Sequence, residues 1–270
     1  MGMSMGRPWR RRLESGALAL IALVWGFPTL WVLYATFVGT GSTSGLTLSN
    51  LVQAWNTAPF AQYTMNTVLI VGGLLITQGL VGLVVGFILA RYEFPGKSLV
   101  TAIFLLQIVV PVYAVLIQDY QIVQGLHLLN TRIGIMLPYM VSGIAVLAFR
   151  QAFRSVPREL EEAARLDGYA TLGVFRRVYL PRVGPAAVAF AVISITFHWT
   201  DFLWPLIVTN SNAARPVVVG LALLAEASES GLQWNLLAAG TAIVIIPVLL
   251  VFVAGTRRIL SSFAATFDWH

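Results

Sequence analysis

The sequence predicts an all-α integral membrane protein with six transmembrane helices and with both termini in the cytoplasm. Three observations lead to this prediction. Hydrophobic residues make up 58% of the 270-residue chain and charged residues only 10%, whereas soluble domains carry about 25% charged residues. The apolar residues form continuous runs of bilayer-spanning length, and Lys and Arg are abundant only in alternate connecting segments. A water-soluble fold of this size could not hide so much apolar surface.

Six apolar stretches can form helical spans, because a hydrocarbon core about 30 Å thick needs roughly 20 helical residues. They are 17–38, 67–90, 99–117, 133–149, 185–208 and 236–256. These runs are continuous and lack the alternation of barrel strands, which favours helices. Three arginines precede the first stretch, as in a signal peptide. That stretch is longer than a signal-peptide core and no small-residue cleavage site follows it, so we interpret it as an uncleaved span.

The distribution of Lys and Arg predicts the orientation. Four basic residues precede the first span, two lie in 91–98, seven in 150–182 and two follow the last span. The remaining connecting segments contain only Arg132, in the predicted loop 118–132, and Arg215. Because basic residues accumulate in cytoplasmic loops, the rich segments and both termini are predicted to be cytoplasmic.

Several other classes of protein are excluded. The chain has no cysteine, so thiolate metal sites and cysteine nucleophiles are impossible. The net charge of +6 does not indicate nucleic-acid binding, because the basic residues are not interleaved with aromatic ones. Pro95-Gly96-Lys97-Ser98 mimics the end of a phosphate-binding loop, but Arg91 occupies the first glycine position and no strand precedes it. We expect no catalytic residue, metal or cofactor on this chain.

The long cytoplasmic segment 150–182 contains two predicted short helices around a turn. Pro157 suits a first helical position, and three glutamates follow near the positive end of the helix dipole. Gly168 after Asp167 is typical of a left-handed helix end. A second helix is predicted from about Thr171 and closes at Pro181. On pattern alone, this element either docks with another protein or lies as an amphipathic segment on the inner leaflet.

A spaced motif within this segment resembles a known family. Glu162-Ala163-Ala164, three residues, Gly168, nine residues and Val178-Tyr179-Leu180-Pro181 resemble the EAA loop of ABC importer permeases, Glu-Ala-Ala-x3-Gly-x9-Ile-x-Leu-Pro. Val178 replaces the isoleucine. The resemblance implies that the loop contains a coupling helix that docks on an ATPase subunit. It implies ATPase-coupling contacts at Glu162, Ala163, Ala164, Asp167, Gly168, Leu180 and Pro181.

The resemblance also implies a domain organisation and a set of partners. Residues 67–260 would be the importer transmembrane domain with its coupling loop 150–182, between an N-terminal region, 1–66, and a C-terminal tail, 261–270. The partners would be a homologous second permease, an ATPase dimer that binds ATP and Mg²⁺, an extracytoplasmic solute-binding protein and membrane lipid. The location would be the bacterial inner membrane, crossed several times.

Other segments narrow the resemblance to maltose-type carbohydrate permeases. Residues 91–97 resemble the cytoplasmic turn after the second span in that group, and 128–131 and 199–206 also resemble it. The last of these usually reads Trp-Asn-x-Phe-Leu-Trp-Pro-Leu, and here Thr200 replaces the asparagine. The substrate implied is a sugar, oligosaccharide or glycerol-phosphate-like solute. The ending Phe263 to His270 departs from the glycine-rich ending usual in the group.

Polar residues within the spans are candidates for the substrate pathway. Asp201 lies in the fifth apolar stretch with His198 three residues earlier, on one helical face. This pair could serve a subunit interface, contact substrate or carry protons in an autonomous secondary transporter, the main alternative function. Trp199 and Trp204 are pathway candidates or interfacial aromatics. Gln78, Gln107, Ser142 and Ser194 are expected to bridge helices.

Overall fold

The computed structural model describes residues 8–39, 45–229 and 234–267, with side chains described for 15–39, 45–226 and 234–255. These residues form helices and turns, with one isolated β-bridge between Val38 and Leu46, so the all-α prediction is confirmed. Arg7 of the predicted N-terminal tail and residues 268–270 of the predicted C-terminal tail lie outside the described residues. The chain divides into two compact units, 1–58 with 221–245 and 59–220 with 246–270.

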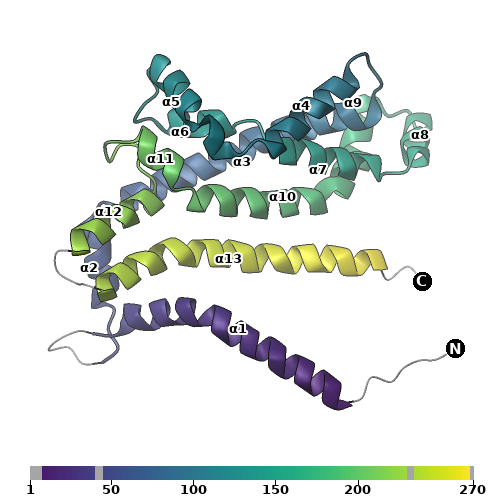
Figure 1. Cartoon of the computed structure of the whole chain (residues 1–270). Helices are drawn as coiled ribbons and strands as arrows, with labels where there is room; N and C mark the ends of the chain where they lie inside the picture. The colour runs from purple at the N-terminus through teal and green to yellow at the C-terminus, as the bar shows by residue number, and fades with distance from the viewer. Residues whose placement is uncertain (1–7, 40–44, 230–233, 268–270) are drawn as a thin grey trace. The chain divides into compact units, whose positions relative to one another are not determined.

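In the described part of the chain, four continuous helical stretches are long and apolar enough to cross a membrane, and Figure 1 shows the helices that carry them. They lie in α1 (Pro8–Phe37), α3 (Phe60–Arg91), the run from α9 to α10 (Thr171–Thr200) and α13 (Trp234–Phe267). Pro28 in α1 and Pro247 in α13 lie inside their helices, as spans allow when neighbouring groups satisfy the freed backbone atoms.

The predicted spans 99–117 and 133–149 are each broken. The first divides into α4 (Lys97–Val109), the 3-10 helix η1 (Val112–Val115) and α5 (Leu116–Gly125), with a bend of 96°. Pro111 explains this break, because it lacks an N–H and forces Val110 to be extended. The second divides into α6 (Arg132–Met136), η2 (Leu137–Tyr139) and α7 (Gly143–Arg154), with a bend of 51°. Six spans result if each bent pair counts as one.

The predicted loop 118–132 is therefore helical over much of its length, in α5, and the prediction of a plain connection was wrong. The predicted fifth span, 185–208, was also wrong at both ends. Helix α10 (Leu180–Thr200) continues from α9 (Thr171–Val174) through a π-helical turn, η3 (Phe175–Tyr179). It ends before Asp201, which is extended, and α11 (Leu203–Val208) is a separate helix.

Pro181 was predicted to close the second short helix, but it stands near the start of α10. The helical run is continuous from Thr171 to Thr200, so Pro181 lies inside it and the neighbouring turn has to accommodate its missing N–H. The preceding π-turn replaces i→i+4 by i→i+5 hydrogen bonds, which lets the helical run continue through this position.

The unit formed by 59–220 and 246–270 is organised around α3, α7 and α10, which pack against one another (Figure 1). Glycines allow α3 to approach α7 closely. A Cβ at Gly82 would lie 2.8 Å from the Cβ of Ala145, and a Cβ at Gly86 would lie 2.9 Å from the backbone nitrogen of Arg150. The close packing of α3 on α7 therefore depends on these two glycines.

The other unit is held together by amide side chains. Helix α2 (Ser49–Thr57) carries Asn50, whose Nδ2 donates to the carbonyl oxygens of Thr36 at 3.0 Å and Val38 at 2.9 Å. The Nδ2 of Asn235, at the start of α13, donates to the same Val38 oxygen at 2.6 Å. The end of α1 is thereby fixed to both helices. Helix α12 (Val217–Glu229) begins in one unit and continues into the other.

The packing of α3 on α7 predicts a difference between two glycines of the same helix. Gly86→Ala should lower the thermal unfolding midpoint in detergent, because its methyl group meets α7 backbone atoms, at a cost of roughly 1–3 kcal/mol. Gly79→Ala is the matched control, since no atom lies within 4 Å of its Cβ position. Equal midpoints for the two variants would contradict this packing.

Candidate functional site

Helix α8 (Arg158–Leu166) and the turn after it form the first candidate site. Pro157 precedes the helix as its N-cap residue, one position before the place predicted from the sequence. At the other end, Gly168 has a φ of +84° and its nitrogen donates to the Arg165 oxygen at 3.0 Å. The nitrogen of Tyr169 donates to the Ala164 oxygen at 3.1 Å. The predicted left-handed helix end is confirmed, and glycine adopts this φ without the strain of a Cβ.

The residues of the motif are divided between two faces of this element. Ala164 is buried against the unit, whereas Glu162, Ala163, Asp167 and Gly168 are exposed. Leu180 and Pro181 are also exposed, at the start of α10. Leu166 is 89% exposed and Leu172, on α9, is 61% exposed. Leu166 was not among the contacts predicted from the sequence. Its exposed side chain lies beside small exposed residues, as a docking surface would require.

The buried side of α8 is attached to the spans by polar contacts. Glu161 accepts a hydrogen bond from the Tyr179 hydroxyl and forms an ion pair with Arg165 at 2.9 Å. Burial alone would raise the pKa of Glu161, but these hydrogen bonds outweigh burial and hold that pKa below its usual range, so Glu161 is ionised at neutral pH. The guanidinium of Arg91, at the end of α3, lies 4.7 Å from the centre of the Tyr179 ring.

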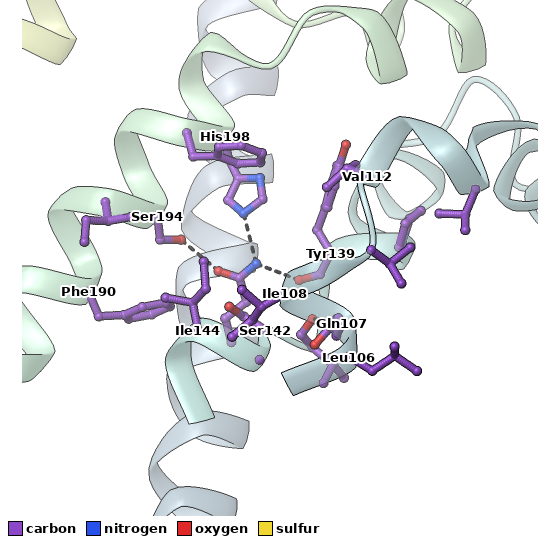
Figure 2. Close-up of a pocket in the computed structure, with 18 of the residues that line it drawn as sticks. Leu106, Gln107, Ile108, Val112, Tyr139, Ser142, Ile144, Phe190, Ser194 and His198 are labelled. Atoms are coloured by element: carbon purple, nitrogen blue, oxygen red, sulfur yellow. Dashed lines mark hydrogen bonds between the residues drawn. The ribbon is translucent and has the colours of Figure 1, made fainter. Parts of the chain in front are cut away.

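A cavity of about 550 Å³ among the helices forms the second candidate site (Figure 2). Side chains from α3, α4, η1, α5, η2, α7 and α10 line it. Apolar groups predominate, and the polar ones are Gln78, Gln107, Asp119, Tyr139, Ser142, Ser194 and His198. An apolar cavity with a few convergent polar groups is the usual form of a small-molecule site.

Gln78 of α3 organises the polar groups of the cavity. Its Nε2 donates to the Tyr139 carbonyl oxygen at 2.6 Å and lies 2.9 Å from His198 Nε2. Its Oε1 accepts from Ser194 Oγ at 2.8 Å. These bonds orient the amide, because a carbonyl oxygen can face only the NH₂ group. The predicted helix-bridging role is confirmed for Gln78 and Ser194.

The same geometry fixes the state of His198. Gln78 presents an N–H to its Nε2, which then acts as the acceptor, and Nδ1, which carries the proton in this tautomer, is buried without a hydrogen-bond partner among the described residues. Protonation of Nε2 would place two donors face to face. The hydrogen bond therefore favours neutral His198.

The four predicted pathway residues are placed differently. His198 lines the cavity, and Asp201 lines a small neighbouring pocket that His198 and Tyr139 also border. The sequence predicted Asp201 inside a span, but α10 ends at Thr200, one residue before it. Trp199 is buried. Trp204 is buried as well, and its Nε1 donates to the Ile135 oxygen at 3.0 Å, which joins α11 to α6.

Sequence reasoning missed Asp119 and Tyr139 as cavity residues. Asp119 was assigned to a connecting loop, but it lies in the first turn of α5. The position of Pro111 was the available signal, since it turns the chain and brings α5 over the cavity. Tyr139 contributes its backbone oxygen to Gln78, and its ring lies 5.0 Å from the His198 ring, contacts between distant segments that no local sequence pattern reveals.

Apolar spanning helices around a cavity, with a firmly attached helix outside the spans, define the chain as a membrane transport protein. Residues 82–262 match the family described as "Binding-protein-dependent transport system inner membrane component", and the chain belongs to this family.

Two relatives are similar over nearly their whole length. The arabinooligosaccharides transport system permease protein AraQ of Halalkalibacterium halodurans is 32% identical, over 90% of this chain and 91% of the relative. The diacetylchitobiose uptake system permease protein NgcG of Streptomyces coelicolor is 31% identical, over 93% and 86%. A chain of a bacterial ABC transporter involved in the import of alginate has the same fold, with a TM-score of 0.80, 19% identity and coverage of 95% and 99%.

The hydrogen bonds of Gln78 lead to a stability prediction. Gln78→Leu should lower the thermal unfolding midpoint in detergent, because it leaves several buried polar groups without a partner, at roughly 1–3 kcal/mol per group. Gln107→Leu, the control, removes one hydrogen bond from an exposed side chain to the Val141 oxygen and should have a smaller effect. A smaller loss for Gln78→Leu than for Gln107→Leu would rule out the assigned role.

Proposed function

We propose that this chain is one of two permease subunits of an ATP-driven importer and that α8 is its coupling helix. The six-span topology, with each bent helix pair crossing once and with both termini cytoplasmic, belongs to the proposal. It places α8 on the cytoplasmic side, where an ATPase dimer binds ATP and Mg²⁺. The chain itself catalyses no reaction. Closure of the ATPase dimer displaces α8 and rocks the spans from inward-open to outward-open.

The observation that carries this proposal is the two-sided construction of α8. One side is fixed to the spans through Ala164 and Glu161. The other side carries Ala163, Gly168 and Leu166, all of which are exposed. Ala163 and Gly168 have little or no side chain. Small side chains let the backbone of a partner approach closely, and we propose that Leu166 enters an apolar pocket of that partner. An amphipathic segment on lipid needs no such rigid attachment.

The proposed substrate is a sugar, an oligosaccharide or a glycerol-phosphate-like solute. This class is supported by the names of the relatives, which include arabinooligosaccharide, diacetylchitobiose and sn-glycerol-3-phosphate transport proteins. The cavity is consistent with it, because amide, hydroxyl and imidazole groups can hydrogen-bond hydroxyl groups while Phe190 and Phe197 supply apolar surface. His198 is the proposed pathway residue, and Asp201, Trp199 and Trp204 support its surroundings.

A homologous second permease and an extracytoplasmic solute-binding protein complete the proposed assembly. Membership of a binding-protein-dependent family supports the second of these. A similar solved transporter, with a TM-score of 0.67, is in complex with a periplasmic protein that holds an alginate pentasaccharide. The alternative of proton coupling through His198 is less favoured, because Gln78 already donates to its Nε2.

A pull-down of the tagged full chain from its native membrane tests the coupling role. Gly168→Ala should reduce the ATPase subunit recovered by about fivefold or more, because a side chain in the left-handed region costs roughly 1–2 kcal/mol. Gly96→Ala is the matched control, since Gly96 has the same φ of +84° and an equally open Cβ position, in the turn between α3 and α4. Recovery of a folded wild-type chain without any ATPase would refute the proposed function.

A further inference from the structure

Three side chains from three different elements meet beneath α8. Arg91 comes from the end of α3, Glu161 from α8, and Tyr179 from the π-turn before α10. The Tyr179 hydroxyl donates to Glu161, and the Arg91 guanidinium lies over the Tyr179 ring. A nitrogen of Arg91 also donates at 2.5 Å to the oxygen of Val156, just before α8. We call Arg91, Glu161 and Tyr179 the clamp.

The clamp is set in a rigid environment. Tyr179 is fully buried, and its ring makes edge contacts with Phe87 at 5.1 Å and Phe153 at 5.9 Å between ring centres. Such an aromatic cluster fixes the direction of the tyrosine hydroxyl. Glu161 is the charged acceptor at the end of that hydroxyl, and hydrogen bonds to charged groups are among the stronger ones.

The π-turn determines where Tyr179 points. It accommodates one more residue than an α-helical turn would, and one residue rotates a side chain by about 100° around the axis. Because the turn directly precedes α10, it directs Tyr179 toward α8 while α10 continues along the spans. π-turns occur often at functional sites, and the function proposed above does not by itself use this one.

We propose that the clamp is the joint that passes displacement of α8 to α3 and α10 together. Its three residues are positioning residues, and none needs to touch the ATPase or the substrate. The inference rests on α8 being the coupling helix. Without the Tyr179 hydroxyl, α8 still docks on the ATPase, because its exposed face is unchanged, but its movement is no longer fully transmitted to the spans.

Tyr179→Phe tests the clamp in the complex purified with its native partners and reconstituted in liposomes. The substitution removes only the hydroxyl and keeps the buried ring. Tyr169→Phe is the control, because it removes a nearby hydroxyl that pairs with Arg177 rather than with α8. Glu161→Gln keeps an acceptor for Tyr179 but removes its charge and the ion pair with Arg165, so it should weaken transmission less than Tyr179→Phe does.

The spans are monitored by Val112→Cys, a cavity residue in a chain that has no other cysteine. Its modification by a membrane-impermeant maleimide, read on this chain by mass spectrometry, should change in rate when ATP and vanadate are added. With Tyr179→Phe, the ATPase should remain bound and hydrolyse ATP, while the change in rate shrinks about fivefold, the effect of one net hydrogen bond.

Three outcomes would count against the clamp. A full response in Tyr179→Phe would show that the hydroxyl transmits nothing, and loss of the ATPase would show that it serves docking. An equal loss in Tyr169→Phe would show that the effect is not specific to the clamp. If the wild-type complex contains the ATPase and one of these three outcomes is found, the clamp is wrong but the proposed function stands. If the wild-type chain is recovered without an ATPase, both are wrong.

Discussion

The absence of hydrogen-bond partners in hydrocarbon is the constraint on which the rest of the structure depends. Each break in a spanning helix frees backbone groups that the protein has to satisfy itself. The Tyr139 oxygen receives the Gln78 amide, the Val141 oxygen receives Gln107, and the Ala145 nitrogen donates to Ser142. These polar side chains thus gather at the break between η2 and α7, within the second bent pair of helices. The cavity borders the same break, since Tyr139, Val141 and Ser142 line it.

Local sequence signals predicted the parts of the fold that depend on local physics. Gly168 after Asp167 predicted a left-handed turn, and the structure has a φ of +84° there. Composition predicted the class of fold. The breaks were harder to locate, because proline occurs both in bent helices and in nearly continuous ones. Pro111 turns the chain by 96° at its break, whereas Pro247 lies inside α13, and the packing around each proline decides between these outcomes.

The candidate sites were predictable to different degrees for the same reason. The residues around Glu162 stand in one short segment with fixed spacing, so the sequence contained their arrangement. The cavity brings together Gln78, Asp119 and His198 from distant segments, and its shape depends on the bend that carries α5. Asp201 was misplaced because an apolar run on both sides suggested one helix, whereas the chain becomes extended at that residue.

The clamp and the cavity lie on the same two elements, α3 and the helical run that includes α10. Gln78 and Arg91 both belong to α3, and thirteen residues of helix span about 20 Å. Tyr179 and Ser194 are connected by the helical run that includes α10. Gln78 and Ser194 are hydrogen-bonded at one end and the clamp joins the same elements at the other, so in the proposed mechanism a displacement of α8 is carried to the cavity by whole helices. Transmission then requires only that α3 and α10 remain straight, and their close packing on α7 supports that.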